Sequence, residues 1–136
     1  MPDARALAAY LENRLSVPRD HVMVLENESA TRVAILEKLR SLANDPRIQR
    51  GDPIIIFYAG HGSEAAAPPG WEAGGSKANI RLILPYDVYC QSRGKMVDPI
   101  PDRTLGALLA AISQNKGNNI VSFHEISTTH VCLTIR

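Results

Sequence analysis

The apolar run from Ile54 to Tyr58 restricts the folds available to this chain more than any other feature. The stretch from Pro53 reads PIIIFY, with apolar side chains at odd and even positions alike, so a strand formed here has two apolar faces. Strands of this kind are typical of parallel sheets that helices cover on both sides. The run therefore predicts a buried strand over Pro53–Tyr58 in an α/β domain.

Three segments have the apolar spacing of amphipathic helices. Leu7, Leu11 and Leu15 recur at every fourth position and predict a helix over about residues 3–15. Thr31 and Asp102 are suitable N-caps for a second and a third helix. The inward positions expected of these two helices are Ile35, Leu36, Leu39, Leu42, Leu105, Leu108, Leu109 and Ile112. Gly117 would end the third helix.

Short β-rich segments alternate with these helices. They predict strands around residues 21–26, 54–58, 80–84 and 119–123, joined in one largely parallel sheet. The segment from Gly62 to Asn79 is rich in Gly, Pro, Ala and Ser and is expected to be a long loop. The last dozen residues match no pattern. The order of elements predicts a layered α/β domain.

Composition excludes several classes of protein. A chain of 136 residues fits one domain, and its net charge of +1 gives no electrostatic case for binding nucleic acid or a membrane surface. Its apolar runs are far shorter than the roughly 20 residues that span a bilayer, and no secretory signal is recognisable, so a cytoplasmic location is expected. Cys90 and Cys132 lack the spacing of a zinc site.

His61 is the candidate catalytic residue. In open α/β sheets, ligands bind beyond the carboxyl ends of the strands, and His61 follows the most apolar strand directly. A histidine in a glycine turn is often only a polar loop residue. Here Gly60 and Gly62 have no side chains, so a substrate can reach the imidazole. For the same reason no side chain covers the Gly62 N–H, which can act as an oxyanion donor. Imidazole also titrates near neutral pH, as proton transfer requires.

The stretch FYAGHGS, Phe57 to Ser63, resembles the catalytic-histidine motif of caspase-like cysteine peptidases, in particular the metacaspase type. The segments from DARALAAYLENR to IIIFYAGHG, PPGWEAGGSKANIRLILPYD and IPDRTLGALLAAISQNKGNNI extend this resemblance over about residues 3–121. The resemblance implies a three-layer caspase-like sandwich with a mostly parallel central sheet. It implies a cysteine-type endopeptidase of the kind linked to apoptosis-like cell death, cutting after Arg or Lys.

The resemblance also suggests roles for individual residues. His61 would activate the nucleophile and protonate the leaving amine, and the Gly62 N–H would help to hold the oxyanion. Asp87, after the strand in LPYD, is a candidate for binding a basic substrate side chain, although capping of a turn explains it at least as well. Glu64 is a weaker candidate. Trp71 is assigned to packing. No cofactor is expected apart from calcium, which is common in the family and for which no ligands can be assigned here.

The family's nucleophile motif, Asp-x-Cys-His-Ser-Gly, is absent, and about Phe123 to Glu125 stand in its place. Cys90 lies in a loop with nothing to lower its pKa, and Cys132 would need a chain reversal to return to His61. The family's first strand is missing as well. We therefore expect a sheet that is incomplete at both ends, with residues 1–123 a caspase-like catalytic domain fragment and 124–136 a divergent tail. The chain looks like a truncated or altered form of a longer protein.

Two functions remain open. The chain is either the histidine-bearing part of a cysteine endopeptidase, inactive alone, or a non-catalytic homologue that binds a protein partner, such as an intact relative. An α/β-hydrolase is excluded because no GxSxG motif occurs.

Overall fold

The computed structural model describes residues 2–71, 79–126 and 132–135. The helices are α1 (Pro2–Arg14), α2 (Arg32–Asn44) and α3 (Asp102–Lys116), with short 3-10 turns η1 (Arg19–His21) and η2 (Asn27–Ser29). The strands are β1 (Met23–Glu26), β2 (Ile54–Gly60), β3 (Gly62–Ala66), β4 (Asn79–Ile83), β5 (Gln91–Ser92), β6 (Lys95–Met96), β7 (Ile100–Pro101), β8 (Ile120–Ile126) and β9 (Cys132–Ile135). This mixture confirms the α/β class.

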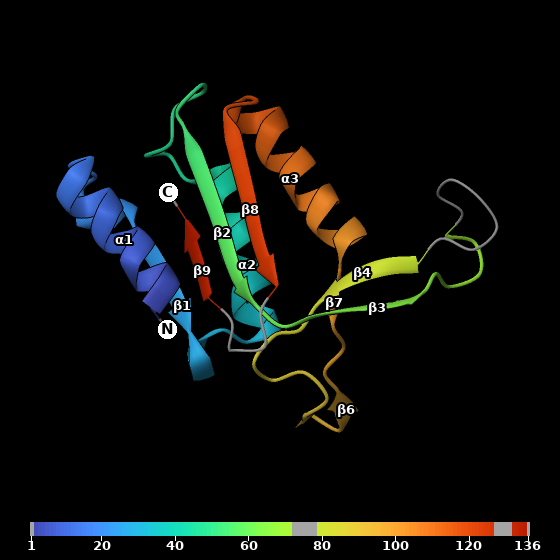
Figure 1. Ribbon diagram of the computed structural model, residues 1–136. Coiled ribbons are helices and arrows are strands. Elements are labelled where there is room, and N and C mark those ends of the chain that lie inside the picture. The colour runs from blue at the N-terminus through green and yellow to red at the C-terminus, as the bar shows by residue number, and fades with distance from the viewer. Residues whose placement is uncertain (1, 72–78, 127–131, 136) are drawn as a thin grey trace.

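The main sheet has four strands in the order β1-β9-β2-β8 (Figure 1). β2 and β8 are parallel over their whole length, from Ile54 opposite Ile120 to Gly60 opposite Ile126. β9 is antiparallel to both of its neighbours, β1 and β2. Three strands of this sheet therefore run in one direction and one runs in the other.

β9 is the strand of the main sheet that the sequence patterns missed. The chain returns after β8, and the four residues of β9 pair with β1 on one side and with β2 on the other. They lie in the interior of the sheet, between β1 and β2. The expected boundary after residue 123 falls inside β8, which continues to Ile126.

The strand predicted at 80–84 does not join the main sheet. β4 (Asn79–Ile83) pairs antiparallel with β3, and β7 extends this second sheet to three strands. The single-sheet prediction is therefore wrong for this strand, and the loop predicted from Gly62 is wrong over β3. The physical reason is that the chain continues as a strand beyond His61, out of the main sheet, and β4 pairs with that continuation (Figure 1).

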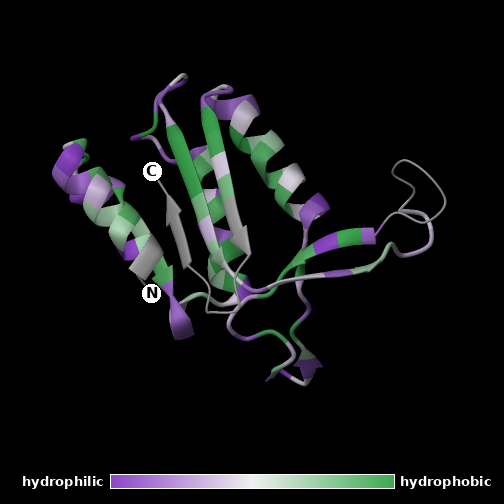
Figure 2. Ribbon diagram, in the orientation of Figure 1, coloured by the Kyte–Doolittle hydropathy of each residue, from purple (hydrophilic) through white to green (hydrophobic). Residues whose placement is uncertain are grey.

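The core lies between the main sheet and α2 and α3. Ile54, Ile56 and Tyr58 alternate along β2 and are buried together with apolar residues of the two helices. The ribbons of β2 and α3 are green, and so hydrophobic, over much of their length in Figure 2. The helical residues predicted to face inward are all in this cluster or packed against it: Ile35, Leu36, Leu39, Leu42, Leu105, Leu108, Leu109 and Ile112. Burying each such side chain contributes roughly 1.5–3 kcal/mol, so this stripe fixes which face of β2 the helices cover.

α1 packs along β1, β9 and β2. Ala4, Ala8 and Leu11 are its buried residues. The predicted stripe through Leu15 is wrong, because the helix ends at Arg14 and Leu15 remains 56% exposed. Ser16 then adopts a positive φ of 53° and turns the chain toward β1.

The helix ends test three sequence predictions. Thr31 is the N-cap of α2, and its hydroxyl accepts a hydrogen bond from the Ala34 N–H at 3.2 Å, as predicted. Gly117, with a φ of 93°, ends α3, also as predicted. Asp102 is not the N-cap of α3, because it lies within the first turn and Pro101 precedes the helix. In the described part of the chain, no helix combines the length and apolar character needed to cross a membrane.

Candidate functional site

His61 stands where the chain passes from the main sheet into the second sheet. It follows Gly60, the last residue of β2, and precedes Gly62, the first residue of β3. Its backbone carbonyl accepts two hydrogen bonds, one from the Tyr58 hydroxyl at 2.7 Å and one from the Leu84 N–H at 3.0 Å. The histidine backbone is therefore fixed by both sheets, while its side chain is only half-buried.

Tyr58 is the residue of this site that the sequence patterns missed. It is 2% exposed, and burial raises the pKa of its phenol, which keeps the hydroxyl protonated as a donor. A hydrogen-bond partner was foreseeable, because a buried tyrosine hydroxyl almost always has one. The identity of that partner was not, since it depends on how the chain turns after Gly60.

The backbone N–H of Gly62 is turned away from β4. The hydrogen bond from Leu84 makes His61 and Leu84 a bonded pair of the antiparallel ladder, and Gly62 lies opposite Ile83 as the next pair. Bonded and non-bonded pairs alternate in such ladders, so the Gly62–Ile83 pair exchanges no bonds. The Gly62 N–H therefore points out of the second sheet beside the histidine.

Asp87 lies on the same side of the molecule, beside the start of α2. Its carboxylate accepts a hydrogen bond from the Arg32 N–H at 2.8 Å, in the first turn of α2. The Tyr86 N–H donates to the Ala30 carbonyl at 3.0 Å and holds the same two segments together. α2 follows the carboxyl end of β1, so Asp87 and His61 both lie beyond carboxyl ends of main-sheet strands. The carboxylate of Asp87 is engaged with a helix N-terminus, where negative charge is favourable.

The weaker candidate Glu64 and the single tryptophan, Trp71, lie on or beside the second sheet. Glu64 is exposed on β3, opposite Arg81 of β4. Trp71 is half-buried, and the Arg103 guanidinium lies over its ring at 5.3 Å from the centroid. Because Arg103 belongs to the first turn of α3, this contact links the segment that follows β3 to that helix. The Trp71 ring therefore contacts a basic side chain of α3, and the packing prediction for Trp71 stays a prediction.

The two cysteines occupy different environments. Cys90 is an exposed free thiol beside the short β5–β6 hairpin, as expected of a loop cysteine. Cys132 begins β9, and its backbone lies opposite Ala59, two residues before His61. The chain reversal that Cys132 required is thus present. Among the residues that the structure describes, no three His, Cys, Asp or Glu side chains are grouped in a way that could hold a metal ion.

Comparison with known proteins gives one positive result. A family model described as the caspase domain matches residues 1–110, which is most of the 136-residue chain and includes β2, His61 and Gly62. No curated protein and no solved structure matches the chain at a significant level.

Proposed function

Since this chain belongs to the caspase domain family, we propose that it is a cysteine-endopeptidase domain that carries the histidine half of the catalytic machinery and is inactive alone. In this proposal α1 forms one helical layer on a mostly parallel sheet and α2 and α3 form the other, as in a three-layer sandwich. The substrate class that the family implies is protein. The proposal refines this to chains with Arg or Lys before the cut.

The observation that carries the proposal is the placement of His61 and Gly62. The imidazole follows the carboxyl end of β2, its backbone is fixed by Tyr58 and Leu84, and the Gly62 N–H beside it points away from the β4 ladder. A general base next to an outward N–H is the pair that acyl transfer requires. His61 would take the proton of a thiol nucleophile and return it to the leaving amine, while the Gly62 N–H donates to the developing oxyanion.

The missing part is the nucleophile. The chain contains no Asp-x-Cys-His-Ser-Gly, and β8 passes through about Phe123 to Glu125 where that motif would stand. A base and an oxyanion donor without a positioned thiolate cannot form an acyl-enzyme. This is why the proposed domain does not turn over substrate alone. The absent motif also favours the second candidate function, a non-catalytic homologue that binds a protein partner.

The test is peptide hydrolysis by the full chain. Fluorogenic peptides with Arg or Lys before the reporter are incubated with the protein, with and without calcium, and we expect no turnover. The same assay is run on His61→Ala, Cys132→Ala and, as a matched control, His21→Ala, whose histidine lies at the amino end of β1. Turnover abolished by His61→Ala and by Cys132→Ala, but not by His21→Ala, would show Cys132 to be a displaced nucleophile and the chain to be active.

A rebuilt chain separates the two candidate functions. It restores Asp-x-Cys-His-Ser-Gly after Phe123 and adds a first strand before α1. Activity that depends on His61 would identify the histidine as a competent base that lacks only its partner. A rebuilt chain that folds and remains inert would contradict the peptidase proposal and favour the protein-binding homologue.

A further inference from the structure

β8 is an edge strand of the main sheet. It is the last strand in the order β1-β9-β2-β8, and among the described residues it pairs only with β2 (Figure 1). Its seven residues keep one register with β2 from Ile120 to Ile126, without a bulge. One side of this strand therefore faces outward from the sheet along roughly 23 Å.

β8 lacks the features that keep edge strands from pairing. Edges are normally blunted by Lys or Pro, by bulges or by short length. The segment IVSFHEI contains no Lys, Arg, Pro or Gly. Val121 and Phe123 are 45% and 53% exposed, and their register opposite Ile55 and Phe57 places them on the face of the sheet that α2 and α3 do not cover. A long, regular and apolar edge of this kind is a template for a further strand.

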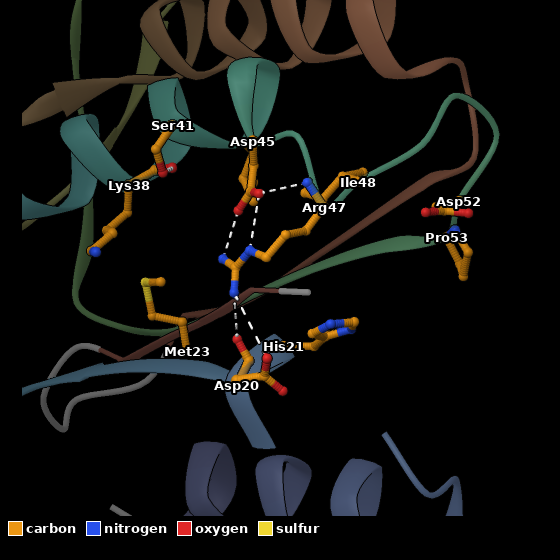
Figure 3. A pocket seen from close by; sticks show the side chains of 11 residues that line it. Asp20, His21, Met23, Lys38, Ser41, Asp45, Arg47, Ile48, Asp52 and Pro53 are labelled. Carbon is orange, nitrogen blue, oxygen red and sulfur yellow. Dashed lines mark hydrogen bonds and ion pairs between the residues drawn. The ribbon is translucent and has the colours of Figure 1, made fainter. Parts of the chain in front are cut away.

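The other edge of the sheet is protected. β1 has four residues and lies between the 3-10 turns η1 and η2. Its Glu26 carboxylate is paired with Arg5 of α1 at 2.7 Å. Arg47, which also binds Asp45, holds η1 in place by donating to the Asp20 carbonyl at 3.2 Å (Figure 3). A short edge that carries a charge and is fixed at its start does not favour pairing, so β8 is the edge available for it.

The helix beside β8 leaves room for a second copy. α3 packs against α2, its leucines and Ile120 of β8 adjoin the same core, and it lies next to β8 in Figure 1. The exposed residues of its middle turns are small and uncharged: Gly106, Ala107, Ala110 and Ala111. No atom lies within 4 Å of the place that a Gly106 side chain would take. This face does not select a partner, but it obstructs none that approaches the edge of β8.

A second copy of β8 is a complementary strand for this edge. In antiparallel pairing with Phe123 opposite Phe123 of the second copy, Val121 falls opposite Glu125 and Ser122 opposite His124. An aromatic pair then stands at the centre, and no two carboxylates face each other. Centring the pairing on Glu125 would put two carboxylates opposite one another, which is destabilising. The sequence thus favours one register of self-pairing.

The size of this surface fits a weak dimer. β8 is roughly 23 Å long, and the sheet edge together with a helix of about 10–12 Å diameter is roughly 20 Å deep. The surface is therefore roughly 450 Å² on each copy and 900 Å² for the pair, the size of weak and transient interfaces. Dissociation in the micromolar range is expected of such an interface.

We propose that two copies of this chain associate through β8, antiparallel about a two-fold axis at Phe123, so that their main sheets join into one. The pairing closes at a dimer because the β1 edge is protected. This association does not depend on the proposed peptidase function, so each can fail without the other.

The test is the mass of the full chain in solution, measured by analytical ultracentrifugation as the concentration rises into the high micromolar range. We expect a monomer–dimer equilibrium. Phe123→Lys places two like charges opposite each other at the centre of the pairing, and it should weaken the dimer about tenfold or more. Val121→Lys is the matched control, because it adds the same charge on the same face of β8 but opposite Glu125 of the second copy, and it should keep the dimer.

An equimolar mixture of Phe123→Lys and Phe123→Glu provides a second measurement. Each variant alone should be monomeric where the unmodified chain is dimeric, and the mixture should recover the dimer, which also shows that both variants fold. A chain that stays monomeric overturns the proposal and favours a strand of a different protein as the occupant of this edge. Equal dimer loss in Phe123→Lys and Val121→Lys, a mixture that does not recover the dimer, or a mass that rises beyond the dimer overturns it as well.

Discussion

The unfolding stability of Asp87 variants can show whether this residue has a structural role at the start of α2 or serves only to bind substrate. Its carboxylate accepts the Arg32 N–H at 2.8 Å, in a partly buried position at the start of α2. A hydrogen bond to a charged group contributes about 1.5–3 kcal/mol, and a carboxylate near a helix N-terminus contributes about 0.3–1 kcal/mol through the helix dipole. If this contact is the role of Asp87, removing it must destabilise the fold.

We therefore expect Asp87→Ala to lower the free energy of unfolding by about 2 kcal/mol. Asp87→Asn keeps an acceptor oxygen and loses the charge, so its cost should be about 0.5–1 kcal/mol. The measurement is urea unfolding followed by circular dichroism. With a slope of about 1–3 kcal/mol per molar urea, the midpoint of Asp87→Ala should fall by about 1 M.

Asp98→Ala is the control for this series, because Asp98 is exposed in the same part of the chain and its change should stay within about 0.5 kcal/mol. Equal stability of Asp87→Ala and Asp98→Ala would refute the helix-start role. If Asp87→Ala then also weakened binding of an Arg-containing peptide, Asp87 would be a substrate residue as the family resemblance suggests.

Three further predictions concern stability. The hydrogen bond from Arg47 lowers the pKa of Asp45 to about 2 from its ordinary 3.8, so this carboxylate stabilises the fold above pH 3.8 and loses that effect as the pH falls toward 2. The urea midpoints of the unmodified protein and of Asp45→Asn should therefore differ at pH 5 and converge near pH 2. A difference between the two midpoints that does not change with pH would contradict this prediction. Thr31→Ala should cost about 1 kcal/mol by loss of the α2 cap, and Thr31→Ser should retain most of it, so equal losses would exclude capping as the cause. Removing residues 132–136 should lower the free energy of unfolding by more than about 2 kcal/mol, because both β1 and β2 lose the strand with which they pair. An unchanged urea midpoint would argue against the place of β9 in the sheet.

The sequence predicted those elements whose signal is local. The apolar run of β2 and the helical spacing of α2 and α3 are local, and the structure has all three elements with the expected faces in the core. The Thr31 cap and the Gly117 helix end are local as well. Each of these follows from a few neighbouring residues and the period of one element.

What the sequence did not predict depends on pairing between distant segments. β4 has the composition of a buried strand, and only its register with β3 places it in the second sheet. Tyr58 could be expected to need a hydrogen-bond partner, but its partner is the His61 carbonyl, which the turn after Gly60 brings back to it. β9 has four residues, too few for a period to be recognised.

The position of β9 links the two unusual features of this chain. Among the described residues, β1 pairs only with β9, so β1 joins the rest of the main sheet through the last strand of the chain. That strand follows closely on the segment that stands where the nucleophile motif would be. Restoring Asp-x-Cys-His-Ser-Gly after Phe123 therefore replaces residues from the end of β8 toward β9, and it endangers the pairing that holds β1. For this reason the rebuilt chain needs a first strand as well as a cysteine: without that strand, loss of activity would report an incomplete sheet and not the competence of His61.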